Sequence, residues 1–236
     1  MSRSDAVWAV VPAAGIGTRM QSDKPKQYLL LNGQPILQHT LERLALHPDI
    51  KGIVVALADG DPWWPQLDLQ LDCTLLPAPG GKERAGSVLN ALNTLSQYTD
   101  EDPWVLVHDA ARPCVRHEDI DRMLASLRCH RIGGILGVPV TDTVKRVDNQ
   151  NNIIETVDRQ GLWRAATPQM FRLSLLQKAL ETACKQGLSV TDEASAMELA
   201  GWQPMMVEGH QDNIKITVQK DLALAALFMQ QQAGGQ

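Results

Sequence analysis

Short runs of apolar residues alternate with longer amphipathic stretches along most of this chain. The apolar runs predict β-strands at residues 6–11, 52–58, 73–76, 104–107, 134–139 and 204–207. The amphipathic stretches predict helices at residues 35–47, 83–97, 117–129, 173–185, 192–200 and 221–231. This order is typical of an α/β protein with a Rossmann-like, mostly parallel sheet and helices on both faces. Ligands of such sheets bind at the carboxyl ends of the strands.

Residues 140–163 interrupt this alternation. Two stretches, 143–147 and 153–157, alternate like strands, and the polar residues 148–152 between them favour a turn. They predict a β-hairpin arm that protrudes from a single domain spanning residues 1–236. Because an isolated hairpin is marginally stable in water, we expect the arm to pack against a second subunit.

Composition excludes several classes of protein. The chain has 236 residues, of which 44% are hydrophobic, enough for the core of one large α/β domain. It has no run of 18 apolar residues and no apolar signal segment at its start, so we expect a cytoplasmic protein with no membrane partner. A formal net charge of -5 argues against nucleic acid as a partner. Four widely spaced cysteines predict reduced, mostly buried thiols.

The first predicted strand is followed by small residues, Pro12-Ala13-Ala14-Gly15, and then by cations at Arg19, Lys24 and Lys26. Small residues let a ligand approach the backbone, and successive N–H groups in such a turn bind anions. The chain lacks a Walker A loop, and Met20 replaces the third glycine of a dinucleotide-binding fingerprint. The loop therefore predicts a different kind of site for a nucleoside triphosphate. A tight turn without a ligand is the alternative, against which the clustered cations argue.

Four segments together resemble a known family. The first is the loop up to Met20, with Pro25-Lys26-Gln27-Tyr28. The others are Val107-His108-Asp109-Ala110-Ala111-Arg112-Pro113, Thr156-Val157-Asp158-Arg159-x-Gly161-Leu162-Trp163 and Asp212-Asn213-Ile214-Lys215-Ile216-Thr217. In this order they resemble the 2-C-methyl-D-erythritol 4-phosphate cytidylyltransferases of the non-mevalonate isoprenoid pathway. The resemblance implies transfer of CMP from CTP to methylerythritol phosphate, with release of pyrophosphate.

The resemblance also implies roles for individual residues. Arg19, Lys26 and Lys215 match the catalytic cations, which this reaction needs because negative charge grows on the phosphoryl oxygens and on the leaving group. The residues that match nucleotide-binding positions are Ala13, Ala14, Gly15, Gly81, Lys82 and Ser87. Lys82 departs from the acidic residue found there in some members, which leaves a backbone contact as its expected role.

Five residues match positions around the polyol phosphate: Asp109, Arg112, Thr143, Arg159 and Thr167. Asp109 follows a predicted strand and is the expected ligand of Mg²⁺ or another divalent cation. A turn carboxylate is the alternative for Asp109. Because Thr143 and Arg159 flank the hairpin, we expect them to reach the site of a neighbouring subunit in a homodimer. A strand threonine and a cross-strand ion pair are the alternatives for these two.

Three rival functions share part of the pattern. A ribitol phosphate cytidylyltransferase would share the loop and the His-Asp-Ala motif, but residues 156–163 favour the methylerythritol phosphate family. A nucleotide-sugar glycosyltransferase would use an Asp-x-Asp motif, and the two present, at 59–61 and 119–121, lie away from His108. A non-catalytic nucleotide-binding protein would not need three catalytic cations. A hydrolase is rejected because no Gly-x-Ser-x-Gly elbow exists, so we expect His108 to be a packed strand-end residue.

Overall fold

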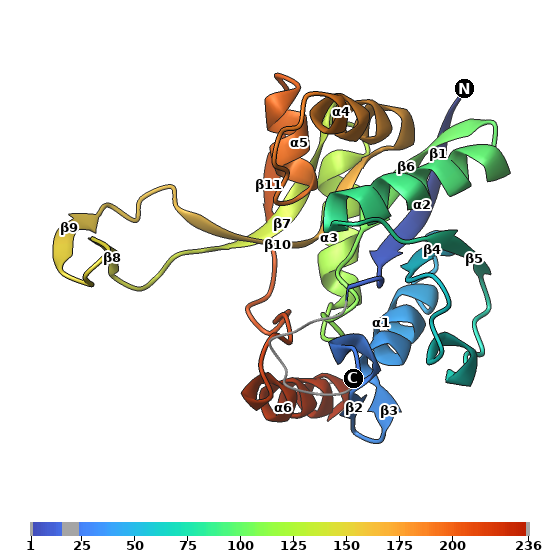
Figure 1. Ribbon diagram of the computed structural model, residues 1–236, viewed down its shortest axis with the longest axis horizontal. Helices are drawn as coiled ribbons and strands as arrows, with labels where there is room; N and C mark the ends of the chain where they lie inside the picture. Colours follow the sequence, from blue (N-terminus) through green and yellow to red (C-terminus); the bar gives the residue numbers. More distant parts are fainter. Residues whose placement is uncertain (1, 16–23, 235–236) are drawn as a thin grey trace.

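The computed structural model describes residues 2–15 and 24–234, with side chains from residue 5 onward. These residues form a seven-stranded sheet in the order β11-β7-β10-β6-β1-β4-β5 (Figure 1). The strands, in that order, are Met205–Glu208, Gly133–Pro139, Trp163–Arg172, Glu101–Val107, Ser2–Pro12, Ile50–Leu57 and Thr74–Pro79. All are parallel except β10, which is antiparallel to both of its neighbours. The predicted α/β fold class is confirmed.

Helices cover both faces of the sheet. One face carries α1 (Ile36–Ala45) and α3 (His117–Leu127), and the other carries α2 (Arg84–Tyr98), α4 (Leu173–Lys185) and α5 (Glu193–Leu199). Successive residues of β1 face opposite layers: Val7 and Ala9 pack with α1 and α3, and Trp8 and Val10 pack with α2. This burial on both faces explains why the central strands are continuous apolar runs in the sequence.

Every predicted strand and helix is present, but β10 was not predicted. β10 contains Pro168. Proline has no N–H to donate to a neighbouring strand, so it usually argues against a strand in the interior of a sheet. The structure accommodates the proline where the pairing of β10 with β7 shifts register, between Ala165 and Gln169. β10 matters because it lies between β7 and β6 and carries Thr167.

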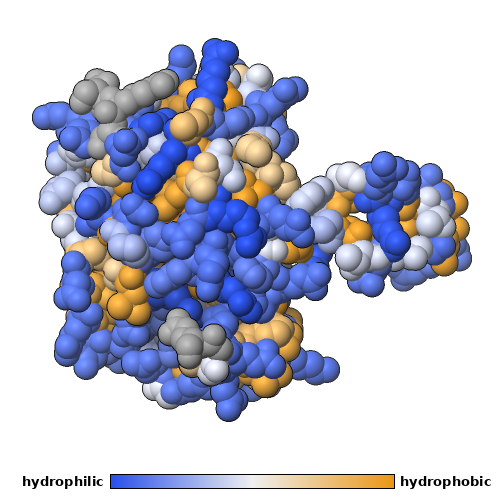
Figure 2. All heavy atoms as spheres, turned by 180° about the vertical axis from the view of Figure 1, so that it is seen from behind, coloured by the Kyte–Doolittle hydropathy of each residue, from blue (hydrophilic) through white to orange (hydrophobic). Residues whose placement is uncertain are grey.

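The predicted hairpin arm is confirmed. It consists of β8 (Val144–Val147) and β9 (Ile153–Val157), and it projects well away from the body of the protein (Figure 1). Asp148 Oδ1 shapes the turn by accepting the backbone N–H groups of Gln150 and Asn152, each at 2.9 Å. Ile153 and Ile154 are 64% and 61% exposed, and apolar side chains are visible on the surface of the arm in Figure 2.

Smaller elements surround one end of the sheet. The short helix η2 (Lys26–Tyr28) precedes β2 (Leu30–Leu31) and β3 (Gln34–Pro35), and α6 (Lys220–Gly234) packs on this pair, while η3 (Trp64–Gln66) lies in the loop after β4. Ile216 is buried in the cluster beneath α6, and its N–H donates to the carbonyl of Ala111 at 2.9 Å. These two contacts hold the segment that carries Lys215 against the loop that follows β6.

Two further predictions from the sequence concern the cysteines and membrane-spanning helices. The four cysteines are free, but Cys129 and Cys184 are exposed, so the expectation of mostly buried thiols is wrong for these two. Cys129 follows the end of α3, and Cys184 lies in the last turn of α4, where both side chains are exposed. Among the described residues, no helix combines the length and the apolar character that crossing a membrane requires.

Candidate active site

The loops that follow β1 and β6 meet at the carboxyl ends of these neighbouring strands. The strand order runs outward in opposite directions from this pair, which is where ligands of doubly wound sheets bind. A cavity of about 570 Å³ opens there. Its lining includes four cationic side chains, Lys26, Lys82, Arg84 and Lys215, and two acidic ones, Glu83 and Asp109. The excess of cations suits a polyanionic ligand.

Gln27 shapes the small-residue loop at one side of the cavity. Its buried Nε2 donates to the carbonyl oxygens of Ala13 at 2.6 Å and Gly15 at 3.0 Å. The Ala13 N–H in turn donates to the carbonyl of Ala56 at 2.8 Å, so the loop is tied to β4. Lys26, the residue before Gln27, lines the same cavity. The sequence predicted no role for Gln27, because it does not reveal which carbonyl groups a side chain reaches.

Close backbone packing shapes the opposite side of the cavity. A Cβ at Gly80 would lie 2.3 Å from the Cβ of Ala14, and a Cβ at Gly81 would lie 2.5 Å from the carbonyl carbon of Gly86. The Gly81 N–H donates to Ser87 Oγ at 2.9 Å, and the Ser87 hydroxyl donates to the Glu83 carbonyl at 3.2 Å. Glycine is required at both positions, because a side chain at Gly80 would collide with Ala14 and the Leu57 carbonyl and one at Gly81 would collide with the first turn of α2.

The structure therefore brings together all six residues predicted to bind the nucleotide. The lining of the cavity contains Ala13, Ala14, Gly15, Gly81, Lys82 and Ser87. Two of the predicted catalytic cations, Lys26 and Lys215, line it as well. The third, Arg19, lies outside the described residues.

Asp109 is the centre of a buried ionic network. Its Oδ1 accepts Arg84 Nε at 3.0 Å, while its Oδ2 lies 2.9 Å from Lys215 Nζ and 3.4 Å from Arg112 Nε. Burial alone would raise the pKa of the Asp109 carboxyl, but Arg84, Lys215 and Arg112 together hold that pKa well below its usual range. Asp109 is therefore ionised at any physiological pH, and it fixes three cations at one edge of the cavity.

A second carboxylate continues this network. Glu193 is buried at the start of α5, and its two oxygens accept Arg84 Nη1 at 2.6 Å and Nη2 at 3.1 Å. The Glu193 and Asp109 charges raise the pKa of Arg84 even though burial opposes them. Neither Arg84 nor Glu193 was predicted as a site residue, since Arg84 lies at a helix start among the residues expected to bind the nucleotide and Glu193 resembles an ordinary acidic residue in the first turn of a helix.

Thr167 supports Asp109 from the missed strand β10. Thr167 Oγ1 accepts the Asp109 N–H at 3.0 Å and lies 3.1 Å from His108 Nδ1. His108 Nε2 lies 2.9 Å from the carbonyl of Arg112, which can only accept, so the neutral ring carries its proton on Nε2. Burial lowers the pKa of His108 to about 4. His108 is thus a packed strand-end residue, and Thr167 donates to its Nδ1.

The two remaining predicted residues lie on the arm. Thr143 precedes β8 and Arg159 follows β9, both are exposed, and neither is among the residues that line the cavity. Arg159 Nη1 donates to the carbonyl of Thr141 at the base of the arm. Within one chain, therefore, neither residue joins the site.

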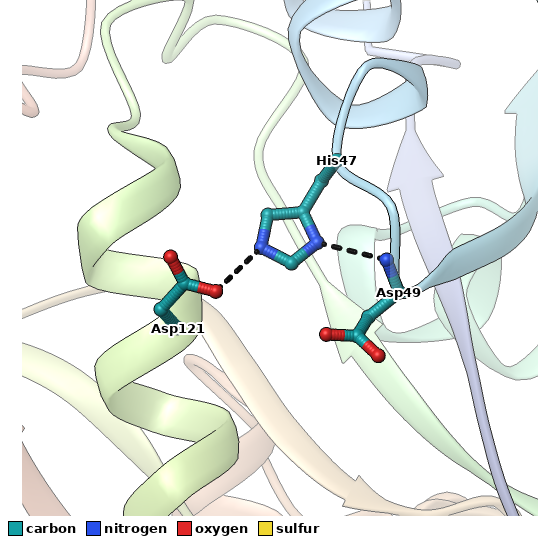
Figure 3. Close-up of side chains that lie close together, drawn as sticks. All are labelled: His47, Asp49 and Asp121. Atoms are coloured by element: carbon teal, nitrogen blue, oxygen red, sulfur yellow. Dashed lines mark hydrogen bonds and ion pairs between the residues drawn. The ribbon is translucent and has the colours of Figure 1, made fainter.

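A separate cluster of His47, Asp49 and Asp121 lies between the end of α1 and α3 (Figure 3). The Asp49 N–H donates to His47 Nδ1 at 3.3 Å, which leaves the ring proton on Nε2, 3.2 Å from Asp121 Oδ1. Arg128 occupies Asp49 Oδ1 at 2.8 Å. Because each ring nitrogen already has a hydrogen-bond partner, the cluster ties the two helices together and offers no nitrogen ligand to a metal.

Comparison with known proteins agrees with this geometry. The model of the family IspD, 2-C-methyl-D-erythritol 4-phosphate cytidylyltransferase, matches residues 7–231. A protein of that name from Vibrio parahaemolyticus is 51% identical over 226 residues, covering 96% of each chain. Another from Pseudomonas fluorescens is 52% identical and covers 93% of this chain and 94% of its own. The crystal structure of the Francisella tularensis enzyme superposes with a TM-score of 0.82 at 40% identity, covering 94% of this chain and 99% of that one.

Proposed function

Since the chain belongs to the 2-C-methyl-D-erythritol 4-phosphate cytidylyltransferase family, we propose how its own residues perform that reaction. The enzyme transfers CMP from CTP to 2-C-methyl-D-erythritol 4-phosphate and releases pyrophosphate, a step of isoprenoid biosynthesis. Residues 1–236 act as one nucleotidyltransferase domain, with residues 140–163 as a dimerisation arm. We place the enzyme in the cytoplasm.

CTP occupies the 570 Å³ cavity, with its base against the Gly81–Ser87 side and its phosphates against the Ala13–Gly15 loop. Gln27 supports the placement of the phosphates at this loop, because its side chain donates hydrogen bonds to two carbonyl oxygens of the loop. The Ser87 hydroxyl donates to the Glu83 carbonyl and accepts the Gly81 N–H, which leaves one lone pair to accept the amino group of the cytosine.

Lys26 and Lys215 stabilise the charge that develops during transfer. The phosphate of the polyol attacks the α-phosphorus of CTP, and negative charge grows on the α-phosphoryl oxygens and on the departing pyrophosphate. Both ammonium groups line the cavity that holds these atoms. Fixed cations in such a site act mainly through electrostatic stabilisation and positioning, so no general base is needed. Arg19 supplies a third cation.

Asp109 and Arg112 bind and orient the polyol phosphate. Asp109 also anchors Lys215 at 2.9 Å, so the carboxylate sets the position of a catalytic cation. Arg112 is braced by Asp109 and by the carbonyl of Asn213, to which its Nη1 donates at 2.7 Å. Thr167 holds the backbone of Asp109 and thereby its register relative to the cavity.

Asp109 would help hold a divalent cation, Mg²⁺ being the expected one, beside the triphosphate of CTP. Three cationic groups already contact the Asp109 carboxylate, so this residue fits a weak or water-mediated ligand rather than a strong direct one. Mg²⁺ commonly retains waters and relies on substrate phosphates. Bound there, the ion would offset charge on the triphosphate.

The arm completes the site of a neighbouring chain in a homodimer. It presents exposed apolar side chains at Ile153 and Ile154, and it carries Thr143 and Arg159 away from the cavity of its own chain. A twofold dimer in which each arm reaches across would bury the isoleucines and bring both polar residues to the partner's polyol phosphate. The guanidinium of Arg159 would then bind the phosphate.

The joining of Lys26, Lys215 and Asp109 at one cavity carries the proposal. The direct test measures pyrophosphate release with CTP and a panel containing methylerythritol phosphate, ribitol phosphate and glycerol phosphate. Of these three polyol phosphates, we expect only methylerythritol phosphate to support turnover with CTP. Preferred turnover of ribitol phosphate would replace the substrate, and release of pyrophosphate without any polyol phosphate would contradict the roles of Asp109 and Arg112.

A further inference from the structure

Glu193 is a buried acid at the edge of the active site that the established reaction does not explain. Its side chain is 1% exposed. It is not needed to cap α5, since Asp192 already does so by accepting the N–H of Ser195 at 2.9 Å. Burying a carboxylate costs free energy of folding unless it is paired, so the position of Glu193 suggests that it has a role.

The start of α5 is a rigid platform for this carboxylate. Gln169 of β10 accepts the Ala194 N–H on its Oε1 and donates from its Nε2 to Asp192 Oδ2, both at 2.9 Å. These two bonds clamp the helix start to the central sheet on both sides of Glu193. Its position is therefore set by the sheet rather than by a mobile loop.

We propose that Glu193 is a positioning residue for cytidylyl transfer, acting on Asp109 and Lys215 through Arg84. This inference rests on the roles proposed above for those two residues. The guanidinium is planar, so a bidentate carboxylate on its Nη atoms fixes the direction of its Nε–H. That N–H meets Asp109 Oδ1 at 3.0 Å, and the other oxygen of Asp109 meets Lys215 Nζ at 2.9 Å.

The charge of Glu193 matters to the Arg84–Glu193 pair as well as its geometry. Arg84 lies between two carboxylates, and Asp109 is shared among Arg84, Arg112 and Lys215. Without the Glu193 charge, the Arg84 guanidinium would keep Asp109 as its one anionic partner in this network. Asp109 would then be drawn toward Arg84 and away from Lys215, which would leave the catalytic ammonium without its anchor.

Steady-state kinetics of Glu193→Gln test the proposal. The amide keeps the size of the side chain but offers one acceptor and no charge. We expect kcat to fall about tenfold to hundredfold, the range in which small misplacements of catalytic groups act. The KM for CTP should stay close to the wild-type value, because the Gly81–Ser87 bond and the Gln27 contacts do not involve Glu193. Glu193→Asp, which restores the charge on a shorter side chain, should recover part of kcat.

A double-mutant cycle separates positioning from a merely structural role. In an Arg84→Lys background, Glu193→Gln should have little further effect on kcat, because the planar connection is already lost. Asp102→Asn provides the matched control: Asp102 is a buried carboxylate at the opposite end of β6 that accepts the N–H of Ser174 at 2.8 Å. It should lower Tm and leave kcat unchanged.

The outcomes are distinct. Wild-type kcat in Glu193→Gln, or effects of Glu193→Gln and Arg84→Lys that simply multiply, would overturn the proposal. If Glu193→Gln does not fold, Glu193→Asp decides, and wild-type kcat in that variant would overturn it equally. Absence of turnover in the wild-type enzyme with CTP and methylerythritol phosphate would instead count against the proposed function.

Discussion

Thr167 Oγ1 accepts a hydrogen bond from the backbone N–H of Asp109 at 3.0 Å, across 58 residues of chain. The same hydroxyl donates to His108 Nδ1. One side chain on the antiparallel strand β10 thus satisfies two buried groups at the end of β6, where the site begins.

Replacing Thr167 with Val should therefore destabilise the protein and slow it. The substitution leaves the Asp109 N–H and His108 Nδ1 without a partner, which costs about 1–3 kcal/mol for each buried unsatisfied group. Urea unfolding followed by circular dichroism measures the loss, and turnover at saturating substrates measures the effect on Asp109. Thr167→Ser keeps the hydroxyl and should behave nearly like the wild type. Equal stability of the Val and Ser variants would contradict this account.

Lys26→Ala and Lys215→Ala should reduce turnover far more than they weaken CTP binding. Their contacts strengthen as charge develops, and loss of one such group typically costs about 10²–10³ in rate. Arg19→Ala is expected to behave alike. Stopped-flow turnover and calorimetric titration with CTP separate the two quantities. Lys185→Ala is the control, because that lysine is exposed and pairs with Glu181 on the solvent side of α4. Near wild-type turnover in either active-site variant would remove that residue from the catalytic set.

Mixing two inactive variants tests whether the site is shared between chains. Lys26→Ala and Arg159→Ala are each expected to be nearly inactive. After subunit exchange, random pairing gives about half heterodimers, in which one site carries both defects and the other carries neither. About a quarter of all sites should then regain activity if Arg159 acts in the partner. No recovery, with exchange verified by mass spectrometry of labelled chains, would make Arg159 a residue of its own chain's site.

Stability should fall with acid through His108. Burial lowers its pKa to about 4, from an ordinary value of 6.5, so the folded state disfavours the proton. The stabilisation is complete above the unfolded-state pKa and is lost as pH falls from about 6.5 toward 4, by roughly 3 kcal/mol for this pKa difference.

Urea unfolding between pH 7 and 4.5 measures this slope. His108→Gln keeps a donor for the Arg112 carbonyl but cannot titrate, so its stability should depend less on pH. His47→Gln is the matched substitution at a second histidine, because burial also lowers the pKa of His47. Identical slopes for the wild type and His108→Gln would contradict the assignment.

The enzyme should require a divalent cation and should prefer CTP. A triphosphate beside the Asp109 network needs further charge compensation, which Mg²⁺ on its phosphates supplies. Turnover measured with CTP, UTP, ATP and GTP, each with and without chelator, checks both expectations. Restoration of activity by added Mg²⁺ controls for damage by the chelator. Full activity in chelator, or equal turnover with ATP, would contradict the prediction.

Local patterns in the sequence determined most of the fold and the composition of the site. Apolar periodicity located the six parallel strands and the helices between them, because burial on one or two faces leaves a regular trace in the chain. The loop at Ala13–Gly15 and the residue Asp109 were placed at strand ends, and parallel strands bring such ends to one edge. The arm was visible because Asp148 and its polar neighbours form a turn between two alternating stretches.

Only the tertiary structure decided which charges neutralise one another. Arg84 and Glu193 are 109 residues apart, and nothing local to either indicates the other. The strand carrying Thr167 was hidden by Pro168, since the register shift that tolerates this proline arises from pairing with β7. Sequence identifies groups able to bind phosphate, because that capacity belongs to the side chain. Their protonation, orientation and anchoring depend on long-range burial and partners, which exist only once the chain has folded.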